Sequence, residues 1–269
     1  MKITFFTDLH YSDEDRDVYF NGTQSLCKLN KIIDATPDSD HYISLGDFVD
    51  FLRDESPALY EQGVEFVKTK GLHPYDGEIK KKTLFGVVGN HETAFIQKSK
   101  LSKFIPYVEG VGSVYTFELG EVLFVAVDAS FDRVSGSDAP EIMRKSTDFI
   151  FPSAQIKWVS EELKSKVKEG TKSIVWISHV AFKDINEDTR TEMANEFLRY
   201  GLPVYIFEGH THVQNFYEKQ TEKGNLKIYN LAPVTFDFTV PVEERKNAYF
   251  YYTATFNDGN IEKVESFRG

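Results

Sequence analysis

Five short segments of the sequence carry side chains that can bind metal ions, and each follows a stretch that is typical of a buried β-strand. They are Asp8-Leu9-His10, Gly46-Asp47 with Asp50, Gly89-Asn90-His91-Glu92, Ser178-His179 and Gly209-His210-Thr211-His212. Carboxylate, imidazole and amide groups all serve as metal ligands in proteins. In an open α/β sheet, ligands bind beyond the carboxyl ends of the strands, so we expect the five segments to meet at one site.

The stretch 41–50 delivers two carboxylates directly after a short buried strand at 42–45. A carboxylate at the end of a buried strand is costly unless a positive group neutralises it. Asp47 is therefore predicted to bind metal, and Asp50 is a second acid in the same loop.

Spacing supports a common site. Residues two apart in an extended chain point to the same side, so Asp8 and His10 are expected to hold one ion together. The same spacing predicts that His210 and His212 face one centre.

Each motif alone has a common structural explanation. A lone histidine such as His179 is more often a hydrogen-bonded core residue than a ligand. The conjunction of motifs makes that explanation improbable, because five of the seven histidines fall at strand ends. The other two, His41 and His73, are predicted to be structural or surface residues.

Alternating strands and helices must position these motifs, and the pattern favours a single α/β domain over residues 1–269. Apolar runs bounded by turn signals predict strands at 2–7, 42–45, 83–88, 173–178 and 204–207. A hairpin is expected at 114–119 and 122–127, around Gly120-Glu121. Helices are expected at 22–35, after Ser56-Pro57, after Pro152-Ser153, and through Met193, Phe197 and Tyr200 to Gly201. Further strands are expected at 215–219, 226–231, 248–256 and 261–267.

Composition limits the partners. The chain is 41% hydrophobic and 27% charged, as is ordinary for a soluble globular protein, and no apolar run approaches a membrane span. A net charge of -11 disfavours a long nucleic-acid duplex or an anionic membrane as partner. A small phosphate ester stays compatible, because divalent cations can make a local site positive.

The only cysteine, Cys27, excludes an intramolecular disulfide and fits a reducing compartment. No signal-peptide pattern follows Met1, so we expect a cytoplasmic location. Cys27 is expected on the apolar stripe of helix 22–35 and is predicted to be a packed core thiol.

The ordered motif set resembles the signature of the calcineurin-like metallophosphoesterases. The motifs run from Asp8 to His212 and so cover most of the chain. The resemblance implies a four-layer α-β-β-α sandwich, in which two mixed β-sheets are flanked by helices. This agrees with the alternation of strands and helices predicted above.

The resemblance also implies two metal ions that share the carboxylate of Asp47. The ligands implied for the first ion are Asp8, His10, Asp47 and His212. The ligands implied for the second ion are Asp47, Asn90, His179 and His210. Such mixed donors suit manganese, iron or zinc better than calcium or magnesium.

A mechanism follows from this resemblance. Two ions about 3.5–4 Å apart clamp a phosphate and lower the pKa of a water between them, so that a metal-bridging hydroxide attacks. His91 is not a ligand in this family and is the candidate general acid for the leaving oxygen. Asp50 is expected to orient the imidazole of His91 and favour its protonated form. Glu92 is interpreted as a supporting carboxylate at a helix start.

Residues beside the motifs indicate which kind of phosphate ester is the substrate. Protein serine/threonine phosphatases of this family carry arginines where this chain has Phe51 and Gly89. Without that bidentate grip on a dianionic phosphate, a phosphoprotein substrate is disfavoured. The segment from Gly209 to His212 is more similar to the small phosphodiesterase branch, which hydrolyses cyclic nucleotides and other diesters. We therefore expect a phosphodiesterase with a small, nucleotide-like substrate.

Two alternatives stay open. One is a phosphomonoesterase of the same fold. The other is a metal-free interaction scaffold, as in the retromer subunit of this architecture, although every ligand position is filled here. The segment 129–151, with Arg133, Arg144 and Lys145, either closes over the site or forms a solvated insertion.

Three lysines follow the Asn90-His91 motif. Lys98, Lys100 and Lys103 either attract anions or form a charged helix face.

Overall fold

The structure, a computed structural model, describes residues 1–13, 22–50, 57–94, 96–131, 149–235, 240–245 and 247–269. The strands of this part form two mixed sheets of six strands each. The first sheet contains β1 (Lys2–Phe6), β2 (His41–Ser44), β3 (His73–Pro74), β4 (Thr83–Gly86), β11 (Phe250–Asn257) and β12 (Asn260–Arg268). Its order is β12-β11-β1-β2-β4-β3, with β1, β2, β4 and β3 parallel.

The second sheet repeats this plan of a parallel centre with antiparallel additions. It contains β5 (Tyr115–Leu119), β6 (Val122–Ala126), β7 (Ser173–Ile177), β8 (Val204–Glu208), β9 (Asn215–Thr221) and β10 (Gly224–Asn230). Its order is β5-β6-β7-β8-β10-β9, with β6, β7, β8 and β10 parallel. The expected hairpin is confirmed, since Leu119 pairs with Val122 across Gly120-Glu121.

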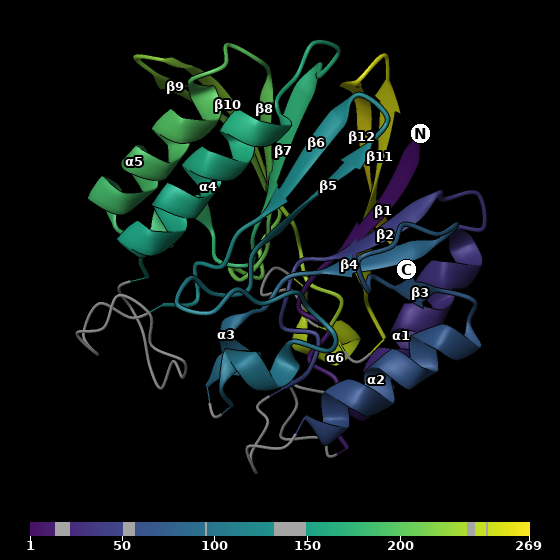
Figure 1. Ribbon diagram of the computed structural model, residues 1–269. Coiled ribbons are helices and arrows are strands. Elements are labelled where there is room, and N and C mark those ends of the chain that lie inside the picture. The colour runs from purple at the N-terminus through teal and green to yellow at the C-terminus, as the bar shows by residue number, and fades with distance from the viewer. Residues whose placement is uncertain (14–21, 51–56, 95, 132–148, 236–239, 246) are drawn as a thin grey trace.

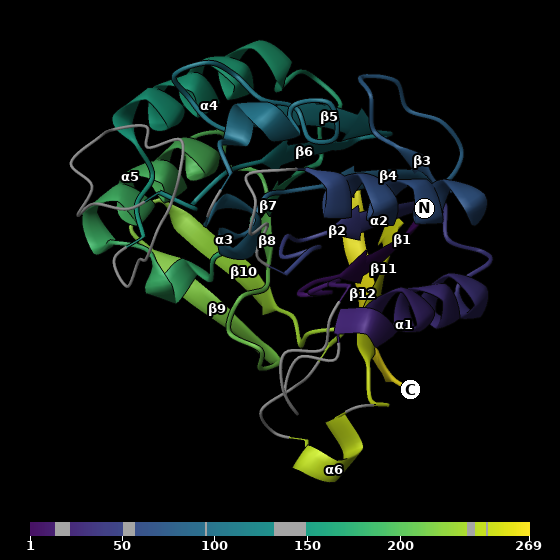
Figure 2. The same cartoon turned by 90° about the horizontal axis from the view of Figure 1, so that it is seen from below.

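Helices cover the outer face of each sheet (Figures 1 and 2). The long helices are α1 (Gly22–Ala35), α2 (Ala58–Thr69), α4 (Ser153–Lys166) and α5 (Glu187–Leu198). The short ones are α3 (Asn90–Thr93) and α6 (Val242–Arg245), with 3-10 turns at Lys98–Leu101 and Phe182–Asp184. Helices α1 and α2 lie on the first sheet, and α4 and α5 on the second. The predicted four-layer α-β-β-α sandwich is confirmed.

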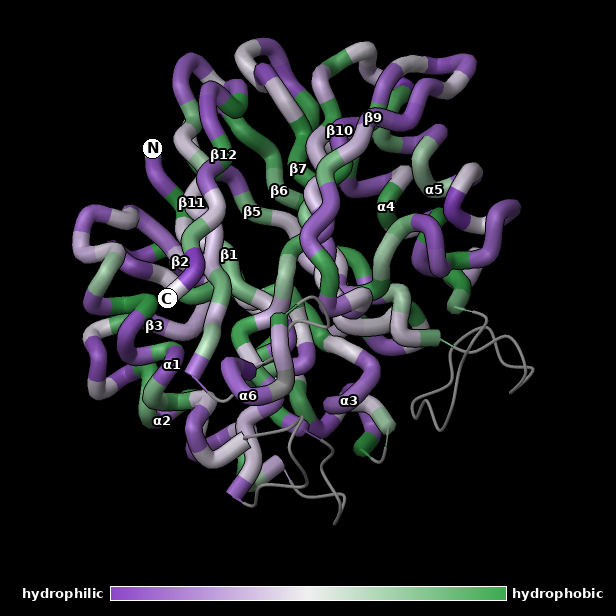
Figure 3. Tube along the Cα trace, turned by 180° about the vertical axis from the view of Figure 1, so that it is seen from behind, coloured by the Kyte–Doolittle hydropathy of each residue, from purple (hydrophilic) through white to green (hydrophobic). Residues whose placement is uncertain are grey.

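Aromatic rings fill the space between the two sheets. Phe5 of β1 stacks on Phe207 of β8 with ring centroids 4.1 Å apart, and Phe85 of β4 stacks on Phe117 of β5 at 3.8 Å. Because side chains alternate along a strand, Trp176 of β7 lies on the outer face of the second sheet, where it packs with apolar side chains of α4 and α5. Burial on both faces explains the continuous apolar runs, visible in β6 and β7 in Figure 3.

Element boundaries differ from the sequence predictions by a few residues. Strand β4 ends at Gly86, before the predicted end of 83–88, and α2 begins at Ala58 with Pro57 as its N-cap residue. Tyr200 lies beyond the end of α5, so the expectation that it belongs to the helix face is wrong. Gly201 closes the turn with a φ of 66°.

The expectation that Cys27 is a core thiol is wrong, because its side chain is exposed. The buried face of α1 contains Ser25, Lys28, Leu29 and Ile32. Cys27 lies two residues before Leu29, which is about 200° away around the helix axis. The error arose because Lys28, rather than Cys27, occupies the buried stripe.

Some sequence predictions concern residues outside the described part of the chain. They are Phe51, Ser56, Arg133, Arg144 and Lys145. The role of the segment 129–151 therefore stays a prediction. None of the described helices has the length and apolar character that a bilayer span requires.

Candidate metal centre

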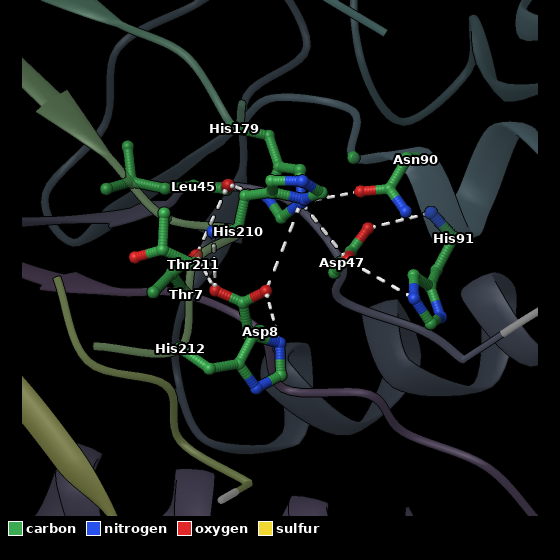
Figure 4. Close-up of polar contacts among 12 residues, drawn as sticks. Thr7, Asp8, Leu45, Asp47, Asn90, His91, His179, His210, Thr211 and His212 are labelled. Atoms are coloured by element: carbon green, nitrogen blue, oxygen red, sulfur yellow. Dashed lines mark hydrogen bonds and ion pairs between the residues drawn. The ribbon is translucent and has the colours of Figure 1, made fainter. Parts of the chain in front are cut away.

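The nine side chains singled out in the sequence come together at one edge of the sandwich, beyond the ends of five parallel strands. Figure 1 shows these strands, and Figure 4 shows the histidines and carboxylates that it labels around Asp8 and Asp47. From the first sheet, β1 is followed by Asp8 and His10, β2 by Asp47 and Asp50, and β4 by Asn90 and His91. From the second sheet, β7 is followed by His179, and β8 by His210 and His212. The sequence prediction that these segments converge is confirmed.

Asp8, His10 and His212 form the first group of possible ligands. Oδ1 of Asp8 lies 3.2 Å from Nε2 of His212 and 3.7 Å from Nε2 of His10. The two Nε2 atoms are 3.3 Å apart. The three atoms therefore lie close enough together to be ligands of one metal ion.

Asp47, His179 and His210 form the second group. Oδ2 of Asp47 is 3.1 Å from Nε2 of His179, and the same nitrogen is 3.1 Å from Oδ1 of Asn90. Nδ1 of His179 lies 2.8 Å from the carbonyl oxygen of Leu45 and donates its proton there. That bond leaves Nε2 of His179, which faces Asp47, as the nitrogen that can bind a metal ion.

His91 stands beside both groups. Its Nδ1 is 2.8 Å from Oδ1 of Asp50, and its backbone N–H donates to Oδ1 of Asp47 at 2.8 Å. The side chain keeps 16% of its surface exposed. His10, Asp47 and His91 also form a third group with ligand spacing. Geometry alone thus allows His91 to act either as a ligand or as a proton donor.

The backbone of the centre is strained. Five of the seven described non-glycine residues with positive φ belong to it: Asp8, His10, Asp47, His210 and His212, with φ between 46° and 69°. Such a conformation costs on the order of 1–3 kcal/mol per residue and is concentrated at functional sites. The prediction that paired ligands converge through extended chain was therefore wrong in its geometry.

Hydrogen bonds between loops hold this conformation. The backbone N–H of Asp8 donates to Gly46 O at 3.1 Å, and that of His10 donates to Asp47 O at 2.8 Å. Buried Glu92 accepts the backbone N–H groups of Asp47 and Gly89 at 3.0 and 2.7 Å. Glu92 thus supports the loop that carries Asp47, as expected from its place in the motif.

Two motif glycines are required by close approach. A Cβ on Gly89 would collide with Oδ1 and the backbone nitrogen of Asp47. A Cβ on Gly209 would collide with the hydroxyl of Thr7 and approach the carboxylate of Asp8. Larger residues at these positions would push the carboxylates out of the centre.

The two central carboxylates are buried and ionised. Burial opposes ionisation, but the charge of His212 and the nearby imidazole of His10 hold the pKa of Asp8 well below its usual range. Burial likewise opposes the ionisation of Asp47, whose pKa is lowered by the charge of His179. Oδ1 of Asp8 accepts no hydrogen bond from the described residues. These carboxylates require positive charge between them.

The same burial and neighbouring charges also shift the pKa values of the histidines. Burial opposes protonation of His10, but the nearby carboxylates of Asp50 and Asp8, at 3.8 and 3.7 Å, raise its pKa to about 10. Burial and the charge of His179 lower the pKa of His210 to about 4, so its imidazole is neutral. Buried carboxylates, neutral imidazole nitrogen and an unpaired oxygen together fit transition-metal ions.

Comparison with known proteins agrees with this donor set. A family model described as calcineurin-like phosphoesterase matches residues 1–214 of the 269 residues. The chain belongs to the calcineurin-like phosphoesterase family. Membership in this family makes it a metal-dependent phosphoester hydrolase and implies a dinuclear transition-metal centre. The matched range includes all nine residues of the centre. No curated protein matches the chain.

Solved structures share the fold of this calcineurin-like phosphoesterase. A dimetal phosphatase from Danio rerio has a TM-score of 0.70 at 13% identity, covering 99% of this chain and 98% of its own. A hypothetical protein from Thermus thermophilus has a TM-score of 0.54 at 13% identity, covering 100% and 99%. A purple acid phosphatase from yellow lupin has a TM-score of 0.57 at 12% identity, covering 98% of this chain and 53% of its own.

The structure of this calcineurin-like phosphoesterase adds supporting residues that sequence reasoning missed. Both the backbone N–H and the hydroxyl of Thr235 donate to the carbonyl oxygen of Asp8. Nζ of Lys28, buried in α1, donates to Thr235 O at 2.6 Å. These residues are far apart in the chain and lack a local motif, so no sequence signal was available.

Lys98 corrects a further expectation. Its side chain is buried, and Nζ lies 2.8 Å from Oδ2 of Asp128 and 2.7 Å from Ser130 O. The ring of Phe131 lies under the same ammonium, with its centroid 3.3 Å away. Neither an exposed charged face nor an anion-attracting role applies to Lys98. Its role is to tie the 3-10 turn to the segment after β6.

Proposed function

We propose that this calcineurin-like phosphoesterase is a two-metal phosphodiesterase for small, nucleotide-like substrates. In this proposal the first ion is held by Asp8, His10, Asp47 and His212, and the second by Asp47, Asn90, His179 and His210. The observation that best supports a two-metal site is the position of Asp47. Its Oδ2 lies 3.1 Å from Nε2 of His179 and 3.9 Å from Nε2 of His10, between the two groups.

When bound, two such ions supply the Lewis acidity that polarises a phosphate group and lowers the pKa of water. The protein orients the side chains that bind the ions. Leu45 O fixes the tautomer of His179, and Glu92 fixes the loop of Asp47. The backbone N–H of His210 donates to Oδ2 of Asp8 at 3.1 Å, which leaves Oδ1 for a metal.

His91 is assigned as the general acid. Asp50 binds its Nδ1 at 2.8 Å, so Nε2 is the atom that can face a leaving oxygen. The contact with Asp50 orients the imidazole ring, so that a proton on Nε2 can be passed to a leaving oxygen. Partial exposure of His91 lets a substrate reach it.

Charge supports a diester substrate. In the described chain, all ion pairs of Asp8 and Asp47 come from histidines, with no arginine or lysine. A dianionic monoester is usually gripped by arginine, whereas a diester carries one negative charge fewer. Gly89 adds no side chain to the site, because a Cβ there would collide with Asp47.

A phosphomonoesterase is the second candidate. Two of the structures with this fold are described as phosphatases, one dimetal and one purple acid phosphatase. The same two-metal centre serves either ester, because the difference lies in the grip on the non-bridging oxygens. A cytoplasmic location completes the proposal and rests on the single cysteine.

The test compares bis-p-nitrophenyl phosphate with p-nitrophenyl phosphate as substrates of the manganese-loaded protein. Both esters release the same leaving group, so the comparison isolates the second substituent on phosphorus. We expect a higher kcat/KM for the diester. Faster cleavage of the monoester would reject the diester assignment in favour of the phosphomonoesterase.

A further inference from the structure

A row of four stacked aromatic rings runs from the core between the sheets to the surface of β9. Phe5 stacks on Phe207 at 4.1 Å, Phe207 on Tyr229 at 4.8 Å, and Tyr229 on Phe216 at 4.7 Å. The last three are cross-strand neighbours on β8, β10 and β9. The interplanar angles range from 10° to 24°. The row presents parallel ring faces in a line.

The outer end of this row is open. Phe216 is 55% exposed, and no other described ring stacks on it besides Tyr229. The described part of the chain has three exposed large hydrophobic residues, Ile79, Val213 and Phe216. Two of the three thus lie within four residues of the metal-centre residue His212. Two exposed apolar side chains this close in sequence to a proposed metal ligand mark a candidate binding surface.

A cavity of about 300 Å³ lies at this end of the row. Phe216, Tyr229, Leu231 and Val264 provide apolar walls, and Gln214 and Ser266 provide polar ones. Its size is at the lower end of small-molecule sites. The combination of flat apolar walls with a few polar groups suits one aromatic ring with polar atoms on its edge.

The cavity shares a wall with the metal centre. Asn230 lines the cavity and accepts a hydrogen bond from the hydroxyl of Thr211 at 2.6 Å. Thr211 stands between the two histidines of the last motif (Figure 4). Gln214, two residues after His212, also lines the cavity and accepts a hydrogen bond from Tyr252 at 3.3 Å. The cavity is therefore connected to the metal centre through the hydrogen bond between Asn230 and Thr211.

We propose that this cavity is a subsite for a flat aromatic group of the phosphoester substrate, which stacks on Phe216 and extends the row by a fifth ring. The proposal rests on the proposed function, because it assigns the substrate class of the same centre. A ring is favoured over a protein partner, because Val213 and Phe216 are the only exposed large hydrophobic residues that the described chain places after His212, and two side chains cover much less area than a stable interface.

The experiment compares diesters that share p-nitrophenol as leaving group and differ in the retained substituent. Methyl, phenyl and thymidine 5′ p-nitrophenyl phosphates are hydrolysed by the wild-type protein, Phe216→Leu and Phe216→Trp. Leucine keeps apolar bulk without a flat ring, whereas tryptophan keeps the flat ring. Ile79→Ala is the matched control, since Ile79 is exposed and lies outside the cavity.

We expect Phe216→Leu to lower the phenyl-to-methyl ratio of kcat/KM about tenfold, the size of one ring-stacking contact. Phe216→Trp is expected to preserve that ratio, and Ile79→Ala to leave activity unchanged. A parallel fall for the thymidine ester identifies the ring as a nucleobase. A fall confined to the phenyl ester identifies it as a simple aryl group.

An unchanged ratio in Phe216→Leu, or an equal fall in Ile79→Ala, would overturn the subsite. A dimer that dissociates in Phe216→Leu, measured by sedimentation, would also overturn it, because a second copy would then cover the ring. Failure of the wild-type protein to hydrolyse any of the esters rejects the proposed function instead. In that case calorimetric titration with diphenyl phosphate decides the subsite: about tenfold weaker binding to Phe216→Leu supports it, and equal binding overturns it.

Discussion

His91 can be read in two ways from geometry, and its contacts favour one of them. It lies with His10 and Asp47 in a group with ligand spacing, yet its Nδ1 is committed to Asp50 at 2.8 Å and its side chain is 16% exposed. The proposed ligands Asp8 and His179 are almost completely buried by comparison. A partly exposed imidazole with a carboxylate behind it is better suited to proton donation.

His91→Ala is therefore expected to keep both metal ions and to slow esters with poor leaving groups most. Proton donation matters least when the leaving oxygen is already stable, so an alkyl ester is expected to lose about 100-fold in kcat and an aryl ester much less. Steady-state kinetics with a matched alkyl and aryl diester measure the split. His73→Ala, at an exposed histidine remote from the motifs, serves as control.

Equal slowing of both esters would argue against His91 as the acid. Loss of one metal ion from the same variant would instead identify His91 as a ligand, in agreement with the third group.

At the residue scale, the sequence predicted which side chains meet but not the backbone that brings them together. The nine residues could be found because metal chemistry restricts both residue type and position at strand ends. The positive φ of Asp8 or His212 could not be predicted, because aspartate and histidine also occupy extended conformations. The strain is maintained by contacts between loops that are distant in sequence.

At the scale of elements, α3 and the loop after β2 fit together only because Gly89 lacks a side chain. Gly89→Ala is expected to displace Asp47 and to destabilise the protein by about 1–3 kcal/mol, as overpacking does. Metal affinity should fall as well, because Asp47 is the shared ligand in our proposal. Chemical denaturation and metal titration measure the two effects.

Gly86→Ala is the matched control for this change. A Cβ at Gly86 would lie 3.7 Å from its nearest neighbours, which is ordinary contact. If Gly89→Ala bound metal and unfolded like Gly86→Ala, the close packing of Gly89 on Asp47 would have no role.

Lys28 connects α1 to the segment that supports Asp8. Burial and the charge of Lys31 lower the pKa of Lys28 to about 8, from an ordinary value near 10.5. Between these values the unfolded chain binds more protons than the folded one, so the contribution of Lys28 to stability rises as pH increases from about 8 to 10.5. The free energy of unfolding of wild type relative to Lys28→Met is expected to increase over this range, by up to about 3 kcal/mol.

Urea denaturation at several pH values measures that difference. Lys164→Met, at an exposed lysine of α4, controls for the loss of one positive charge. A stability difference that falls with pH would show that the folded protein stabilises the charged form of Lys28 and would contradict the lowered pKa.

The elements themselves were largely predictable, whereas buried lysines were not. Apolar periodicity identified α1 and α4, and continuous apolar runs identified β7 and β8. Periodicity treats lysine as a surface residue, so it placed Cys27 inside α1 in place of Lys28. Lys98 was also predicted to be a surface residue. Its buried partner Asp128 is distant in sequence, so no local pattern indicated the pair.

At the scale of the whole molecule, the metal centre joins the two sheets. Asp8 and Asp47 follow strands of the first sheet, and His179 and His212 follow strands of the second. The four-layer architecture was expected from the family resemblance, and the order of strands was not. The pairing of β1 with β11 joins segments about 250 residues apart and leaves no local signal.

Metal binding should consequently stabilise the whole fold. Manganese at about 100 times its Kd is expected to add about 2.7 kcal/mol per site, and so to raise Tm by roughly 5–10 °C per site. Differential scanning calorimetry with and without chelator measures the shift. His73→Ala should show the same shift as wild type, whereas a Tm independent of manganese would contradict a centre shared between the sheets.

The central claim is that Asp47 is shared by two ions, and metal stoichiometry tests it most directly. Elemental analysis of the wild-type protein and of Asp47→Asn, both dialysed at fixed free manganese, gives the number of ions per chain. The variant removes one negative charge at nearly constant shape. Two ions in the wild type and weakened occupancy of both sites in Asp47→Asn are expected. Two fully retained ions in Asp47→Asn, or fewer than two in the wild type, would contradict it.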